Sequence, residues 1–403
     1  MDIIKLVLIF TCIIVVMKFN KPLYLSIAAG VVATIILYAI NPLKAIELMG
    51  ISTFSKDTIY LILAFYSITF LQRMLEKRGH LILAEKSLSN LFNSRRVNAM
   101  VAPFIIGLLP SPGAILISAP IVNNAAENYI TKEEKTFVTS YFRHISESFL
   151  PTYASILLAL NLSHIDMTSF VLGMLPMVVV LFLLGYFFYV RKIPKETGLP
   201  KSKDKPQDVK NLIISLWTIV LTISIILTLK VPVHLAVIPV IILSIILNKF
   251  NFKEIKPMFR SALETKLVFT TIIIMMFKQI LTFSGVVQRL PNYFSALPIH
   301  PVVIFALIFF IGALVAGGQA TIALAMPLAF ATLPNGGLGL MICLMCMNYI
   351  AMQVSPTHIC LAMAVEYYDV SFINLVKKTM PVLISFILIS SAYSYMIFLV
   401  FKP

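Results

Sequence analysis

Three ionisable side chains, Arg143, His144 and Glu147, lie within five residues of one another in an apolar part of the chain. Arg143 and Glu147 are four residues apart, so they share one face of a helix and can form an ion pair. Charged groups inside an apolar span are costly and usually face a polar cavity. The pattern has two interpretations: a structural ion pair, or a site where Glu147 binds a proton or sodium ion with His144 as its relay partner.

A second set of polar residues gathers where the apolar runs are interrupted. Prolines and glycines break the runs in GLLPSPGAILISAP (107–120), at Gly317-Gly318-Gln319, at Pro151 and at Pro356. Inside a bilayer such breaks persist only where protein or a water-filled cavity satisfies the freed backbone groups. The positive end of a broken helix suits an anion and the negative end a cation. The candidate substrate and ion ligands at these breaks are Ser111, Gly113, Glu147, Ser148, Thr152, Gly318, Gln319, Thr321, Gln353, Ser355, Thr357 and His358.

Two further residues complete the candidate site. Lys278 lies within an apolar run of the second half, where it either meets an anionic substrate or Glu147, or extends to the membrane interface. With Arg143, His144 and Glu147 it forms the predicted charge-coupling set. His358 either donates to a substrate oxygen or packs among helices. The only Cys-x-x-Cys pair, Cys343 and Cys346, lacks a partner pair, so we expect no metal and no cofactor beyond a coupling H⁺ or Na⁺.

The composition identifies the class of protein. Of 403 residues, 59% are hydrophobic and 12% are charged, which predicts an all-α polytopic membrane protein. The net charge of +15 comes from residues in the connections between apolar runs, which favours anionic lipid over nucleic acid as the partner. No nucleotide-binding loop, zinc-protease motif or nucleophile elbow is present, which argues against an enzyme and against a primary pump.

Run lengths predict the transmembrane elements. The segments 97–126 and 301–333 are each about thirty residues, too short for two full crossings, and are predicted as re-entrant hairpins. The segments 137–160 and 338–365 are predicted as broken helices, at Pro151 and Pro356. The remaining spans are expected near 3–17, 23–40, 57–72, 167–190, 212–229, 235–248, 267–283 and 380–401.

The distribution of basic residues supports this membrane topology. It places 24 of the 32 Lys and Arg on one side, mostly in the connections 73–96, 191–210 and 249–266. By the positive-inside rule that side is cytoplasmic. This topology therefore predicts a multi-pass protein of the cell (plasma or inner) membrane with both termini outside.

Similar landmarks recur at nearly one spacing along the chain. Pro151-Thr152 and Pro356-Thr357 are 205 residues apart, and the two hairpin breaks are about 207 apart. Each half holds about five transmembrane helices and one hairpin, an odd number of crossings, so the second half must be inverted. We predict two inverted-topology repeats, 1–190 and 211–403, joined by a cytoplasmic linker at 191–210.

These motifs resemble the ion transporter superfamily, which includes gluconate permeases and divalent anion–sodium symporters. The stretches Ser355 to Leu361 and Glu147 to Thr152 are similar to an uncharacterised family of prokaryotic membrane proteins related to gluconate permeases. The divalent anion symporters carry Ser-Asn-Thr at the hairpin tips, whereas this chain has Pro110-Ser111-Pro112 and Gly317-Gly318-Gln319. That departure argues against dicarboxylate selectivity and two sodium sites. The resemblance implies a proton-coupled organic anion carrier.

The sequence thus favours a secondary transporter of a small organic anion, a sugar acid or carboxylate, coupled to protons or sodium. A cation/proton antiporter is the alternative within transport. A membrane scaffold or lipid-handling protein without a solute site is the alternative from another class. A homodimer is left open.

Overall fold

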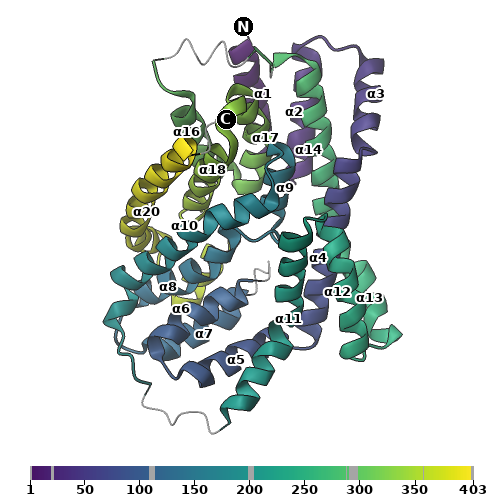
Figure 1. Cartoon of the computed structure of the whole chain (residues 1–403). Helices are drawn as coiled ribbons and strands as arrows, with labels where there is room; N and C mark the ends of the chain where they lie inside the picture. The colour runs from purple at the N-terminus through teal and green to yellow at the C-terminus, as the bar shows by residue number, and fades with distance from the viewer. Residues whose placement is uncertain are drawn as a thin grey trace.

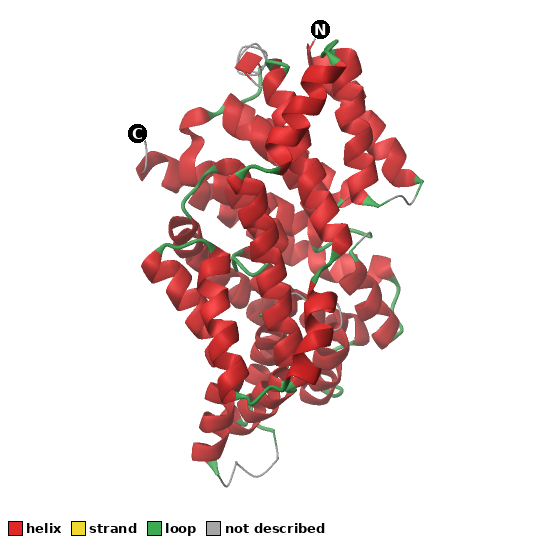
Figure 2. Ribbon diagram, turned by 90° about the vertical axis from the view of Figure 1, so that its right-hand side faces the viewer, coloured by secondary structure: helices red, strands yellow, loops and turns green. Residues whose placement is uncertain are grey.

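The computed structural model describes residues 2–19, 22–108, 114–197, 204–286, 288–289, 298–356 and 358–400. These residues form helices and connecting loops, with no strand among them (Figures 1 and 2). Six of the described helical segments are long and apolar enough to cross a membrane. The chain is an all-α, multi-pass membrane protein.

The helices of the first half are α1 (Asp2–Lys18), α2 (Leu23–Leu37), α3 (Pro42–Thr53), α4 (Lys56–Lys77), α5 (His80–Phe92), α6 (Arg95–Ile106), α7 (Ala114–Ala126), α8 (Lys132–His144), the 3-10 helix η1 (Ile145–Ser148), α9 (Ala154–Ser163), α10 (Met167–Phe188) and the 3-10 helix η2 (Val190–Lys192). Those of the second half are α11 (Lys205–Leu229), α12 (Val233–Leu247), α13 (Phe252–Ala262), α14 (Thr265–Phe283), α16 (Pro301–Ala316), α17 (Gly318–Thr332), the 3-10 helix η3 (Pro334–Gly336), α18 (Gly337–Met352), α19 (Ile359–Tyr368) and α20 (Phe372–Val400).

Three helices lie in segments that the sequence analysis treated as connections. Helices α3, α5 and α13 are short and carry charged residues, so a search for long apolar runs passes over them. Local signals nevertheless define two of their starts. The Asn41 side chain accepts a hydrogen bond from the Leu43 N–H, and Asn251 forms a capping box with Glu254. The predicted linker at 191–210 is also shorter than expected, because α11 already begins at Lys205.

The two halves repeat one order of elements. Among the described helices, α1–α4 correspond to α11–α14, and α6–α10 correspond to α16–α20. Backbone details recur as well: Gly79 and Gly285 both have positive φ, and His164 and Asp369 both end their helices in the left-handed region. Equivalent elements lie at opposite ends of the molecule in Figure 1, with α3 high and α13 low, and with the α16–α17 hairpin above the α6–α7 hairpin.

Contacts between the halves come in reciprocal pairs. Helix α2 packs on α14 while its counterpart α12 packs on α4, and α7 packs on α19 while α17 packs on α9. Reciprocal contacts of this kind are what a two-fold relation generates. They interleave the two hairpins with the two broken helices in the middle of the molecule.

The hairpin turns are not equally described. The first turn, at 109–113, lies outside the described residues, so the predicted ligands Ser111 and Gly113 do too. The second turn is at Gly317, with φ 87° and ψ 153°, a conformation essentially restricted to glycine. This residue lets α16 end and α17 begin with no intervening loop.

Candidate functional site

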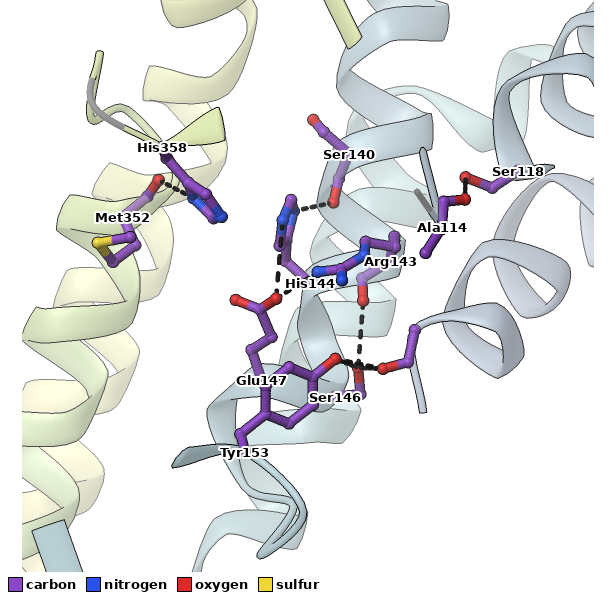
Figure 3. Close-up of polar contacts among 11 residues, drawn as sticks. Ala114, Ser118, Ser140, Arg143, His144, Ser146, Glu147, Tyr153, Met352 and His358 are labelled. Atoms are coloured by element: carbon purple, nitrogen blue, oxygen red, sulfur yellow. Dashed lines mark hydrogen bonds and ion pairs between the residues drawn. The ribbon is translucent and has the colours of Figure 1, made fainter. Parts of the chain in front are cut away.

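The break in the first half is held by a hydrogen-bond cluster on the carbonyl oxygen of Gly107. Helix α8 ends at His144, and α9 starts only at Ala154. Between them, Ser146 Oγ donates to the Gly107 oxygen at 2.5 Å, and the Tyr153 hydroxyl donates to the same atom. The end of α6 is thereby tied to the broken helix (Figure 3).

The break in the second half is held in a related way. Helix α18 ends at Met352, and α19 starts at Ile359. Ser355 Oγ donates to the Leu314 oxygen of α16 at 3.0 Å, which ties the second break to its own hairpin. His358, the N-cap residue of α19, places Nδ1 2.9 Å from the Met352 oxygen.

A cavity of about 310 Å³ lies where the two breaks meet. It is built from both halves: α8, η1 and α9 supply one wall, and α17, α18 and α19 supply the other. Its lining residues are Arg143, Glu147, Tyr153, Ala154, Ser155, Gly318, Gln319, Met345, Asn348, Tyr349, Met352, His358, Ile359 and Cys360.

Arg143 and Glu147 form an ion pair at the edge of this cavity. The guanidinium is buried, with 1% of the side chain exposed, whereas Glu147 is 23% exposed. His144 is fully buried, and its Nε2 lies 3.9 Å from a Glu147 oxygen. In Figure 3, dashed lines join the same Glu147 oxygen to the side chains of Arg143 and His144.

Three helix N-termini also open onto the cavity. Helices α9, α17 and α19 begin at Ala154, Gly318 and Ile359, all of which line it. Their N-cap residues, which are all described, make no side-chain cap hydrogen bond. The Gly318 N–H of α17 donates to the Met352 sulfur at 3.1 Å. Helix N-termini carry partial positive charge, so their convergence with Arg143 favours an anion.

Two polar residues of α18, Asn348 and Tyr349, line the same cavity. Asn348 Oδ1 and the Tyr349 hydroxyl are buried and have no hydrogen-bond partner among the described residues. An unsatisfied buried polar group costs about 1–3 kcal/mol. A small shift of either side chain toward the cavity would let it contact a bound solute or water.

The structure brings together part of the predicted residue set. Arg143, Glu147, Gly318, Gln319 and His358 line one cavity although they come from both halves. His144 lies directly behind Glu147, and its ring faces that of His358 with centroids 4.6 Å apart.

The other predicted ligands at the helix breaks are not among the residues that line the cavity. Ser148 and Thr321 bond to backbone oxygens of their own helical turns, and Ser355 bonds to α16. Thr152 Oγ1 and Gln353 Nε2 are buried without a partner among the described residues, outside the lining. Thr357 lies outside the described residues.

Lys278 is not brought to the cavity. It is half-buried on α14, and the charge that acts on it most is Asp57, in the first turn of α4. Helix packing, which the sequence does not show, decides which face of α14 points inward.

Sequence reasoning missed nine of the fourteen lining residues, among them five with polar side chains: Tyr153, Ser155, Asn348, Tyr349 and Cys360. A usable signal existed for two of them, since Asn348 and Tyr349 are polar residues inside the long apolar run of α18. Tyr153 and Cys360 follow the two Pro-Thr elements by one and three residues, so a wider window around each break would have included them.

The fold and the cavity together define an all-α, multi-pass membrane protein with a cavity lined by both halves of the chain. A similar fold is seen in the crystal structure of the Alcanivorax borkumensis YdaH transporter, which is described as having an unusual topology. The TM-score is 0.51 at 11% sequence identity, over 88% of this chain and 89% of that chain. At this identity the similarity concerns the fold alone.

The family is identified by sequence. Residues 3–400 match the model described as "Protein of unknown function (DUF401)", and the chain belongs to that family. No curated protein matches the chain. Neither comparison names the ion transporter superfamily or the gluconate permeases, so that resemblance stays a prediction.

Proposed function

We propose that this protein is a secondary transporter of a small organic anion, a sugar acid or another carboxylate, coupled to protons or sodium. The observation that carries the proposal is the cavity between the halves, where three uncapped helix N-termini converge beside Arg143. Its volume of about 310 Å³ is in the lower part of the range for small-molecule sites.

The charges of the cavity support an anion that arrives together with a cation. As the structure stands, the charges of Arg143 and Glu147 cancel, and the guanidinium is occupied by the carboxylate. A proton or sodium ion bound at Glu147 weakens that ion pair. Arg143 then becomes available to a substrate carboxylate, which it can bind through two parallel hydrogen bonds. Cation and anion binding are coupled because both depend on the same ion pair.

The repeat supports alternating access. Equivalent elements lie at opposite ends of the molecule, and contacts between the halves are reciprocal, as expected for a pseudo-two-fold axis in the membrane plane. Rocking of one half against the other about this axis exposes the same cavity to either side in turn. The orientation that we propose keeps the basic connections cytoplasmic.

The second candidate is a cation/proton antiporter, in which Glu147 binds the ion and Lys278 is its counter-charge. The exposed part of the Glu147 carboxylate inside the cavity favours this candidate. The position of Lys278 outside the cavity lining favours the anion transporter, because the counter-charge of the antiporter is then absent from the cavity.

A binding and flux experiment separates these functions. The unfolding midpoint of the purified full chain is measured with and without sugar acids, dicarboxylates, sodium or lipid. A separate, unheated sample is reconstituted into liposomes, and uptake of the stabilising anion is measured. Stabilisation and gradient-driven uptake of an anion support the proposal. Stabilisation by sodium alone supports the antiporter, and stabilisation by lipid alone supports a scaffold and refutes transport.

A matched pair of charge deletions localises the site. Arg143→Gln should abolish stabilisation by the anion, whereas Lys44→Gln, which removes an exposed positive charge on α3, should leave it unchanged. Equal stabilisation of both variants would show that the anion does not bind at Arg143.

A further inference from the structure

Three side chains with metal-binding atoms meet beside the cavity. They are His144 at the end of α8, His358 at the start of α19 and Cys360 in the first turn of α19. Their ligand atoms all lie within 4.8 Å of one another, and all three residues are buried. Two of them come from the second half and one from the first, so the cluster exists only because α8 packs against α19.

Both imidazoles are oriented as metal ligands usually are. His144 Nδ1 lies 2.5 Å from the Ser140 oxygen, and His358 Nδ1 lies 2.9 Å from the Met352 oxygen. A carbonyl oxygen only accepts, so each Nδ1 carries the proton and each Nε2 presents its lone pair. Metal-bound histidines characteristically fix their second nitrogen in this way, often on a backbone carbonyl. Figure 3 shows the two rings directed toward each other.

The lone pair of His144 is left without a protein donor. Its Nε2 is fully buried and makes no hydrogen bond with any described residue. The Glu147 oxygen, 3.9 Å away, is too distant for a hydrogen bond. An ionised carboxylate also has no hydrogen to donate to this nitrogen. A cation at this position would satisfy the nitrogen that the protein itself leaves unpaired.

We propose that His144, His358 and Cys360 bind one thiophilic transition-metal ion, Zn²⁺ being the best match. Two imidazoles and a thiolate are ligands for zinc or copper, whereas Na⁺, Mg²⁺ and Ca²⁺ prefer oxygen. Tetrahedral zinc, with bonds of about 2.0–2.3 Å, places its ligand atoms roughly 3.3–3.8 Å apart. Atoms that now lie within 4.8 Å must therefore approach by about 1 Å, which small rotations of these side chains provide.

The charges and protons of the proposed site balance. Cys360 binds as a thiolate and releases its proton to solvent, so zinc and thiolate together carry one positive charge. Arg143 and Glu147 cancel each other beside it. Three protein ligands leave the fourth position open toward Glu147 and the cavity, where water, hydroxide or a carboxylate oxygen can bind.

A metal ion at this site would restrict the relative motion of the two halves. A metal ion bonded to α8 and to α19 links the first half to the second. It should therefore stabilise the arrangement seen here and slow any motion that separates those helices. This inference concerns metal binding and does not depend on which solute is transported.

Metal binding is testable without a transport assay. The full chain, purified in detergent without a polyhistidine tag and stripped with a chelator, is titrated with Zn²⁺ by calorimetry and with Co²⁺ by absorption spectroscopy. We expect one ion per chain and a cobalt spectrum with thiolate charge-transfer and tetrahedral bands.

Variants distinguish this site from adventitious binding. Cys360→Ser and His144→Gln should each weaken Zn²⁺ binding by at least about 100-fold, beyond the range of second-shell changes. Cys12→Ser, which alters a thiol on α1, should bind as the wild type does. The variants are first compared by thermal unfolding without metal, and His358→Gln replaces any that fails to fold. The absence of stoichiometric binding, or equal binding by all variants, would overturn the proposal.

Discussion

Gly107→Ala tests whether the packing of the first hairpin on the broken helix shapes the cavity. A Cβ at position 107 would lie 2.1 Å from the Arg143 oxygen and 3.0 Å from its carbonyl carbon. Ordinary contacts are more than about 1 Å longer than the first distance. Both contacted atoms belong to backbone, so no side-chain rotation relieves the clash. Helix α6 must move away from α8.

The expected cost follows from what that movement disrupts. Forcing an extra methyl into a packed interior costs about 1–3 kcal/mol. The Gly107 oxygen also loses hydrogen bonds from Ser146 and Tyr153, each worth about 0.5–1.5 kcal/mol. The total is about 2–6 kcal/mol, so we expect the unfolding midpoint of the purified protein to fall by about 2–7 °C. Transport should fall further, because Arg143 and Tyr153 lie in the displaced segment.

Two other glycines serve as controls. At Gly50 in α3 an added Cβ meets nothing within 4 Å, so Gly50→Ala should be neutral or slightly stabilising. At Gly318 it meets side-chain atoms of Asn348 at 2.8 Å and of Met352 at 3.2 Å, which can shift. Gly318→Ala should therefore alter solute binding with a smaller loss of stability. If Gly107→Ala has the same unfolding midpoint and the same transport activity as Gly50→Ala, the packing of Gly107 on α8 does not shape the cavity.

Three more predictions address coupling, pH and topology. If Glu147 binds the coupling cation, Glu147→Gln should abolish gradient-driven accumulation in liposomes and leave part of the substrate exchange; normal accumulation would leave the residue as a structural partner of Arg143. Burial tends to raise the pKa of Glu134 at the loop end of α8, but hydrogen bonds from Lys192, Thr131 and Lys378 outweigh it and hold the pKa below its usual value. A carboxylate whose pKa is lower in the folded than in the unfolded protein stabilises the folded state at neutral pH. This stabilisation is lost as the pH falls through the folded-state pKa. Glu134→Gln should therefore lower the unfolding midpoint at pH 7 and match the wild type only once the pH has fallen below the lowered pKa of Glu134, and a constant difference across pH would contradict this origin. Cysteines placed at the exposed positions Asn124 and Asn335 should label from opposite sides, cytoplasmic and external respectively, and labelling from one side would remove the inverted repeat.

Much of the fold could be predicted from the sequence because its signals are local. Apolar run lengths located the transmembrane helices, and prolines and glycines located the interruptions, since both act within a few residues. The break before Ala154 and the turn at Gly317 occur where these residues indicated. The helices α3, α5 and α13 could not be found by the same means, because they are short and their charged residues interrupt any long apolar run.

The sequence by itself also determined which ionisable groups had to be accommodated. Arg143 and Glu147 pair because they are four residues apart on a helical stretch, and this spacing needs no tertiary contact. Their cost inside an apolar run already required a polar surrounding.

Only the tertiary structure decided what that surrounding is. Cys360 and His358 reach His144 across more than 200 residues of chain because α19 packs against α8. Lys278 and Asn348 are both polar residues inside apolar runs of the sequence, yet Asn348 lines the cavity and Lys278 does not. Which face of a helix turns inward depends on the helices packed around it, and hydrophobic periodicity is weak in helices that are apolar on every side.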